Sequence, residues 1–134
     1  MNILLDTHIA LWALADDPSM PAKARNLLLD PENTLYYSTV STWEVLLKQR
    51  SAHNNLNLDP EHFVSYCREA GFIPLPISDR HICAAATLVW HGKANEHNDP
   101  FDRLLIAQAK AENFSLLTHD ERIPFFDEKC ILAV

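Results

Sequence analysis

The sequence predicts a single α/β domain, residues 1–134, with a mostly parallel central sheet of four to five strands and helices on both faces. Short apolar or β-branched runs alternate with stretches in which apolar residues recur at helical spacing. The connections are too long for hairpins, so right-handed crossovers must join parallel strands. A chain of 134 residues that is 48% hydrophobic can bury one core without disulfides, and it is too short for two domains.

The first half of the chain predicts two strands. Asn2–Leu5 is a short apolar run, which is typical of a strand buried on both faces, and a helical pattern follows it at Ile9, Leu11, Trp12 and Leu14. Thr34–Thr39 is rich in aromatic and β-branched residues and predicts the second strand. Further elements expected here are a helix from Pro21 to Leu29, a helix over Ser41–Arg50 and a polar loop over Ser51–Asp59.

The second half predicts three helices and the remaining strands. The helices are expected over Pro60–Ala70, where Gly71 ends the first, and over Asp79–Trp90 and Pro100–Glu112. A strand over Phe72–Ile77 contains two prolines, which are tolerated best at a sheet edge. Ser115–Thr118 predicts a fourth strand and Ile131–Val134 a short fifth.

Composition excludes several classes of function. The net charge of −7, from 11 Lys and Arg against 18 Asp and Glu, argues against a protein that binds long nucleic acid by phosphate neutralisation alone. Cys67, Cys83 and Cys130 are odd in number and widely spaced, which favours neither a disulfide framework nor a zinc–thiolate site. No run of about 18 apolar residues occurs. We therefore expect a soluble cytoplasmic protein without a signal peptide or a membrane partner.

Acidic residues follow the predicted strands. Asp6 follows the first strand and Asp120 the fourth, while Glu44 and Asp102 lie about one turn into helices. In open α/β sheets the functional crevice lies beyond the carboxyl ends of the strands. We expect these side chains to converge at one edge of the sheet.

Each acid also has a capping explanation. Ser41-Thr42-Trp43-Glu44 fits a capping box with Ser41 as the N-cap, and Asp99 fits an N-cap followed by Pro100 at the first helical position. Asp6 and Asp120 could cap the turns that follow them. Capping does not require convergence, however, and carboxylates a few ångströms apart raise one another's pKa or bind a cation. Such oxygen ligands suit Mg²⁺ or Mn²⁺, which can activate water for attack on a phosphodiester.

Four segments resemble the PIN-domain nucleases, and most closely the VapC-type toxins of bacterial toxin–antitoxin pairs. They cover essentially the whole chain, in the family's order and at its spacing. The segments are Leu4-Leu5-Asp6-Thr7-His8, Ser38-Thr39-Val40-Ser41-Thr42-Trp43-Glu44, the run from His97-Asn98-Asp99-Pro100-Phe101-Asp102-Arg103 to Ala109, and Leu116-Leu117-Thr118-His119-Asp120.

The resemblance implies a three-layer α/β/α PIN-like domain with Mg²⁺- or Mn²⁺-dependent endoribonuclease activity. It also implies an RNA substrate, a cognate antitoxin and a homodimer. The family's catalytic and metal-binding acids fall on Asp6, Glu44, Asp102 and Asp120. Asp99 is assigned to capping or to indirect support of the metal, with direct ligation less favoured. Thr7 and Thr118 match hydroxyl positions that orient a carboxylate or bind a metal-held water.

Other functions remain open at this point. A haloacid-dehalogenase-like phosphatase also places Asp after its first strand, but it needs Asp-x-Asp and position 8 is His8. A PIN-domain RNA-processing nuclease without a toxin role and an inactive PIN-like scaffold are further alternatives, although none of the four acids is missing.

Several other residues have structural interpretations that we favour over functional ones. His8, His97 and His119 neighbour the acids but fit loop or solvent positions. Arg103 is expected to form an ion pair, with Asp99 as a candidate, or to reach a phosphate. Trp12, Trp43 and Trp90 are expected in the core or at a dimer surface.

Overall fold

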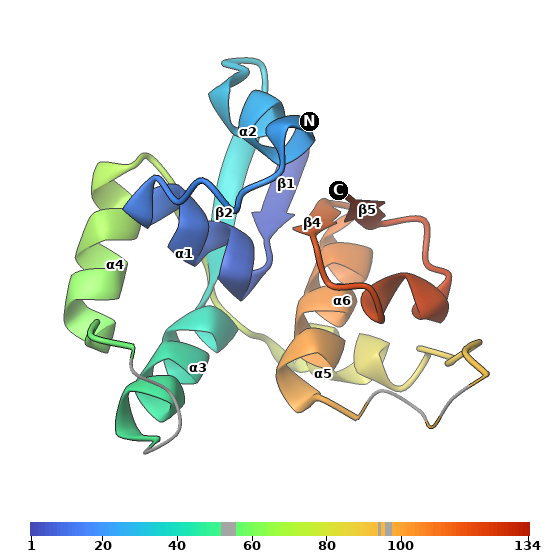
Figure 1. Cartoon of the computed structure of the whole chain (residues 1–134). Helices are drawn as coiled ribbons and strands as arrows, with labels where there is room; N and C mark the ends of the chain where they lie inside the picture. Colours follow the sequence, from blue (N-terminus) through green and yellow to red (C-terminus); the bar gives the residue numbers. More distant parts are fainter. Residues whose placement is uncertain (52–55, 94, 96–97) are drawn as a thin grey trace.

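The computed structural model, which describes residues 1–51, 56–93, 95 and 98–134, is built around one five-stranded sheet (Figure 1). All adjacent strands pair in parallel, in the order β3-β2-β1-β4-β5. The strands are β1 (Asn2–Leu5), β2 (Thr34–Ser38), β3 (Ile73–Leu75), β4 (Ser115–Thr118) and β5 (Ile131–Ala133). The prediction of a parallel α/β sheet is confirmed, and β3, shorter than the predicted strand Phe72–Ile77, is the edge strand that Pro74 and Pro76 predict.

The strand order places a switch point between β1 and β4. From β1 the chain builds outward through β2 to β3, and it then returns to add β4 on the other side of β1. At such a point the loops that leave the two central strands diverge, which opens a crevice beyond their carboxyl ends. Asp6 follows β1 and Asp120 follows β4, so both lie at this crevice.

Helices cover both faces of the sheet, and successive residues of β1 therefore point into two different apolar cores. Ile3 and Leu5 belong to one core, with apolar residues of α1, α2 and α4, whereas Leu4 belongs to the other, with residues of α3 and α6. The helices are α1 (Thr7–Ala15), α2 (Ala22–Leu29), α3 (Thr39–Arg50), α4 (Pro60–Glu69), α5 (Asp79–Ala85), α6 (Pro100–Glu112) and the 3₁₀ turn η1 (Ile123–Phe126). The strand Asn2–Leu5 is thus buried on both faces, as its apolar run predicts.

The prediction that Ser41 caps the helix before Glu44 is wrong. Helix α3 begins at Thr39, and its N-cap is Ser38, whose Oγ accepts a 2.9 Å hydrogen bond from the Val40 amide. Strand β2 ends at the same residue, one position earlier than predicted. Ser41 lies within the helix, fully buried, and its hydroxyl contacts Thr7 instead.

The helix predicted over Asp79–Trp90 is also too long, because α5 ends at Ala85. Beyond it, Leu88 enters the second core and the Trp90 ring packs against the rings of Phe125 and Phe126. These contacts bend the chain away from the helix axis. The apolar spacing that suggested five more helical residues therefore reflects the packing of a turn and of the irregular segment after it.

Two further observations concern the cysteines and the helices. All three cysteines are free thiols, and burial raises the pKa of Cys67 to about 12. None of the helices in the described part of the chain combines the length and the apolar character needed to cross a bilayer.

Candidate active site

Asp6 follows β1 at the switch point between β1 and β4. Its side chain is only 4% exposed, and its Oδ2 accepts a 2.7 Å hydrogen bond from the hydroxyl of Thr118. The Asp6 amide donates to the carbonyl of Leu117 at 3.0 Å, which fixes the backbone against β4. Although Asp6 occupies the N-cap position of α1, its side chain makes no capping hydrogen bond. The capping explanation therefore does not account for this carboxylate.

Without a bound cation, the surroundings of Asp6 disfavour the ionised form of its carboxyl group. Burial raises the pKa of Asp6, and the nearby negative charge of Glu44 raises it further. The hydrogen bond from Thr118 and the proximity of His8 act in the opposite direction but do not cancel the effect of burial. A bound cation would compensate this charge.

Glu44 projects from the first turns of α3 toward the same crevice. Its Oε1 accepts a 2.8 Å hydrogen bond from the hydroxyl of Thr7, and its Oε2 lies 3.1 Å from the ammonium group of Lys48. Because the Thr7 proton is committed to Glu44, the Ser41 hydroxyl donates to Thr7 Oγ at 2.8 Å. Thr7 thus orients a carboxylate, which is one of the two roles that the resemblance implies for it.

Asp99 caps α6, as predicted. Its Oδ1 accepts hydrogen bonds from the amides of Phe101 at 2.8 Å and Asp102 at 3.1 Å, and Pro100 follows at the first helical position. Asp102 lies in the first turn of the helix and is half-buried. Capping by Asp99 therefore fixes the backbone that carries Asp102.

Asp120 is connected to Asp6 through one hydroxyl. The Asp120 amide donates to Thr118 Oγ at 3.0 Å, and the same oxygen donates its proton to Asp6. The Asp120 carboxylate accepts from the Arg122 amide at 2.7 Å, so it does stabilise the turn that follows, as the capping alternative expected.

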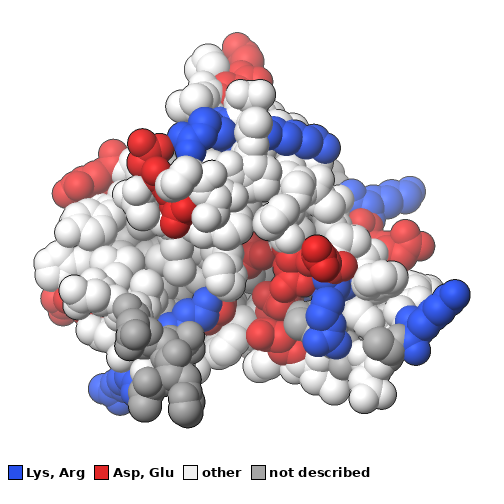
Figure 2. Space-filling view, viewed as in Figure 1, with Lys and Arg blue, Asp and Glu red and all other residues white. Residues whose placement is uncertain are grey.

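Contacts in the structure link Asp6 to Glu44 through their charges and to Asp120 through the Thr118 hydroxyl. Figure 2 shows acidic side chains clustered near the middle of the molecule in this view. Within the described ranges, no group of three or more His, Cys, Asp or Glu side chains is close enough to hold a metal ion. Mg²⁺ usually keeps several waters and binds proteins through one or two carboxylates. Asp6 and Glu44, whose charges already interact, fit that requirement.

A row of rings borders the site. The His8 ring centroid lies 6.1 Å from that of Trp12, which lies 5.8 Å from that of His119. Trp12 is half-buried between these histidines, so it lies at the rim of the site. The guanidinium of Arg103 lies 5.2 Å from the Phe126 ring centroid. His97 lies outside the described residues.

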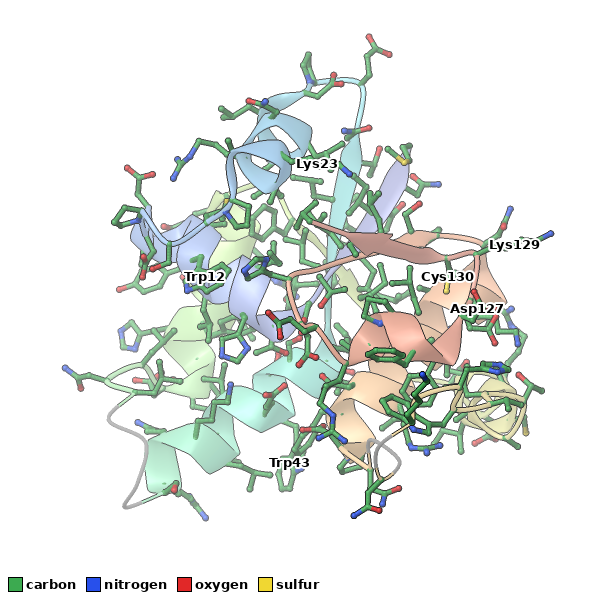
Figure 3. The ribbon with its side chains drawn as sticks, turned by 45° about the vertical axis from the view of Figure 1, so that its right-hand side comes forward. Trp12, Lys23, Trp43, Asp127, Lys129 and Cys130 are labelled. Carbon is green, nitrogen blue, oxygen red and sulfur yellow. The ribbon has the colours of Figure 1, made fainter. Side chains whose placement is uncertain are left out.

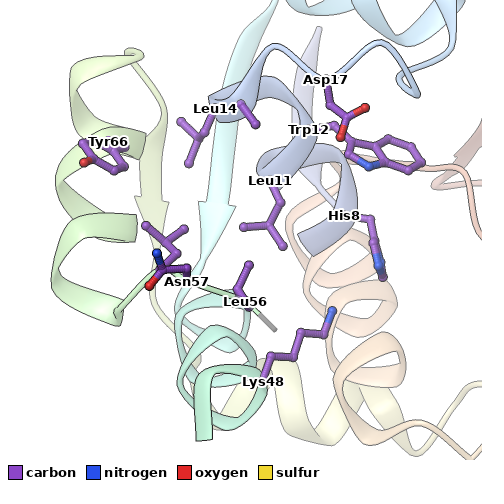
Figure 4. Close-up of a pocket in the computed structure, with 11 residues that line it drawn as sticks. His8, Leu11, Trp12, Leu14, Asp17, Lys48, Leu56, Asn57 and Tyr66 are labelled. Carbon is purple, nitrogen blue, oxygen red and sulfur yellow. The ribbon is translucent and has the colours of Figure 1, made fainter. Parts of the chain in front are cut away.

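An apolar groove of about 550 Å³ runs from this rim between α1, α3 and α4 (Figure 4). Lys48 and His8 lie at one end of it, with Lys48 extending from α3 toward the His8 side chain. Sequence reasoning missed Lys48. The signal was present, since Glu44 and Lys48 are four residues apart and share one face of a helix.

Comparison with known proteins identifies the type of domain. The model of the PIN domain family matches residues 3–129. Among proteins with curated annotation, none matches this chain significantly.

Solved structures with the same fold include chains of three toxin–antitoxin or related complexes. A chain of VapBC2 from Rickettsia felis, bound to a promoter DNA fragment, has a TM-score of 0.66 at 20% identity and covers 100% of this chain and 98% of that one. A chain of VapBC-5 from Mycobacterium tuberculosis has a TM-score of 0.63 at 15% identity, and the match covers 99% of this chain and 97% of that one. A chain of FitAcB from Neisseria gonorrhoeae has a TM-score of 0.62 at 20% identity, and the match covers 97% of this chain and 96% of that one.

Proposed function

Because the chain belongs to the PIN-domain family of nucleases, we propose that it is a Mg²⁺- or Mn²⁺-dependent endoribonuclease of the VapC type. The observation that carries the proposal is Asp6, a buried carboxylate beside Glu44 at the switch point of the sheet. The family match leaves the phosphatase alternative without support, since that mechanism needs a second aspartate where this chain has His8.

The side chains divide the chemistry between them. Asp6 and Glu44 would hold the metal ion, and Asp102 and Asp120 are the further acids assigned to it. When bound, the ion supplies an activated water at neutral pH and neutralises charge on the phosphodiester. Thr118 orients Asp6 and Thr7 orients Glu44 through their hydroxyls. Asp99 holds the amide of Asp102 at the start of α6.

The test is cleavage of single-stranded RNA by the purified protein with Mg²⁺ or Mn²⁺. We expect cleavage that chelation with EDTA abolishes and that Asp102→Asn removes. Asp127→Asn is the matched control, because Asp127 is exposed and has a positive φ of 51°, a conformation that asparagine tolerates. Cleavage that survives exhaustive chelation would contradict the metal mechanism.

We further propose that an antitoxin silences the enzyme by docking along the apolar groove. Three properties support this: the groove reaches the rim of the site, the chain carries a net charge of −7, and structures of the same fold are toxin–antitoxin complexes. A cationic antitoxin segment would therefore be attracted to the acids. A small neighbouring reading frame for a DNA-binding protein would favour this toxin role over housekeeping RNA processing.

A homodimer is the last part of the proposal. Trp43 is 54% exposed and Leu47 is 40% exposed, and they lie one turn apart on α3. Figure 3 shows Trp43 projecting away from the body of the molecule. An exposed apolar patch of this kind is typical of an association surface.

A further inference from the structure

Lys48 holds one of the two oxygens of Glu44, and this contact points to a role that the metal mechanism does not include. We propose that Lys48 neutralises Glu44 in the resting site, gives up that carboxylate when the metal ion binds, and then contacts a phosphate oxygen of the RNA strand in the groove. The inference rests on the proposed nuclease function and adds a residue to it.

The first step is that both oxygens of Glu44 already have a partner. Thr7 occupies Oε1 at 2.8 Å, and the ammonium of Lys48 lies 3.1 Å from Oε2. A metal ion that binds Oε2 must displace the ammonium or share the oxygen with it. Two cations on one carboxylate repel each other strongly at these distances.

The second step is that the ion pair is largely shielded from water. The Glu44 side chain is 12% exposed and that of Lys48 is 22% exposed. An exposed pair of this spacing would matter little, whereas loss of one partner here leaves a poorly solvated charge.

The third step is the destination of the displaced ammonium. Of the described residues that line the groove, Lys48 is the only Lys or Arg. Figure 4 shows the Lys48 side chain extending into the space below His8. A short rotation about its flexible stem keeps the ammonium at the groove wall beside the acids. A phosphate that approaches a metal ion on Glu44 would meet it there.

The experiment separates the two halves of this role. Mn²⁺ binding is measured without RNA, by calorimetry and by the EPR signal of the free ion, for the parent and for Lys48→Met. We expect the dissociation constant of Mn²⁺ to fall roughly tenfold in the variant, because a competing like charge is removed. At saturating Mg²⁺ we expect kcat/KM for RNA to fall by about the same factor, because a phosphate contact is lost. Lys48→Arg should restore kcat/KM toward the parent value.

Opposite changes distinguish this role from simple support of the fold, which would weaken both metal binding and catalysis. Lys110→Met is the matched control: Lys110 pairs with Glu128 at 2.8 Å, away from the acids, and its loss should change neither readout. If Lys48→Met does not fold, Lys48→Gln keeps the size and a hydrogen bond to Glu44 while removing the charge. An unchanged or weaker Mn²⁺ affinity in a folded Lys48 variant would overturn the inference alone. Absence of Mn²⁺ binding and of metal-dependent cleavage in the parent would overturn the proposed function as well.

Discussion

The hydroxyl of Thr118 donates its proton to Oδ2 of Asp6 over 2.7 Å, and this bond joins the carboxyl ends of the two central strands. The same oxygen accepts the amide of Asp120 at 3.0 Å. One hydroxyl therefore sets the orientation of Asp6 and the start of the loop that carries Asp120. The bond to Asp6 is buried and therefore strong relative to similar bonds on the surface, while the bond from Asp120 is part-buried.

Replacing Thr118 by Val keeps the shape of the side chain and removes this donor. We expect the affinity for Mn²⁺ to fall by about 10- to 100-fold, the usual effect of removing a partner that orients a metal ligand. Calorimetric titration with Mn²⁺ measures it. Thr34→Val, at the far end of β2, is the control and should leave the affinity unchanged. A Thr118→Val protein with parental affinity would show that Asp6 needs no such support.

Replacing Asp6 by Asn should abolish cleavage while stabilising the metal-free fold at neutral pH. Burial raises the pKa of Asp6, so the folded protein binds this proton more tightly than the unfolded chain does. The stability that Asp6 contributes is therefore complete below the ordinary aspartate pKa and is lost as the pH rises through the raised value. Asparagine does not ionise and escapes this loss.

Thermal unfolding in EDTA at several pH values tests this. The melting temperature of Asp6→Asn should exceed that of the parent at pH 7, and the difference should shrink toward pH 3. Asp127→Asn serves as the exposed control. If Asp6→Asn instead melts well below the parent at pH 7, then Asp6 has a mainly structural role.

A buried amide connects the two helices that carry Glu44 and Asp102. Gln108 of α6 is fully buried, and its Oε1 accepts a 2.5 Å hydrogen bond from Ser38, the N-cap of α3. Its Nε2 donates to the carbonyl of Leu75 at 3.3 Å. Gln108→Leu should lower the free energy of unfolding by about 1–3 kcal/mol, because it leaves the Leu75 carbonyl and the Ser38 hydroxyl without this partner.

Urea unfolding measures that loss. Gln49→Leu, an exposed position on α3, makes the same chemical change without burial and should alter the midpoint little. Equal midpoints for the parent and Gln108→Leu would contradict the importance of this junction.

The exposed patch on α3 predicts the oligomeric state. We expect the parent to sediment as a dimer and Trp43→Glu to sediment as a monomer with a similar melting temperature, because the charge would be buried at the interface. Leu29→Glu is the control, since Leu29 is 73% exposed on α2, outside the patch. A parent that sediments as a monomer would remove the dimer from the proposal.

The sequence predicted the kind of sheet well because alternation of strands and helices is a local property. It did not predict strand order, because the pairing of β1 with β4 depends on contacts across most of the chain. Ser38 and Ser41 were not distinguished as caps, since both are suitable residues and only the end of β2 decides between them.

Side-chain relationships in the site were harder still. The resemblance gave the acids, and spacing alone could have paired Glu44 with Lys48. The shielding of this pair from water depends on α1 and the groove, and their position around the pair cannot be predicted from a local sequence pattern. The capping box formed by Ser78 and His81 was missed for another reason. The Ser78 amide donates to the His81 side chain, where a Glu or Gln is the usual acceptor.

The place of β4 in the sheet also governs when activity can arise during synthesis. Asp6 is synthesised long before its partner Thr118, which lies 112 residues later in strand β4, the strand that pairs with β1. A nascent or truncated chain that ends before residue 115 has the first acid without its hydroxyl, and it also lacks the neighbouring strand that buries it. Assembly of the site is thereby postponed until β4 has been synthesised, which gives a binding partner made at the same time the opportunity to meet the chain as it completes folding.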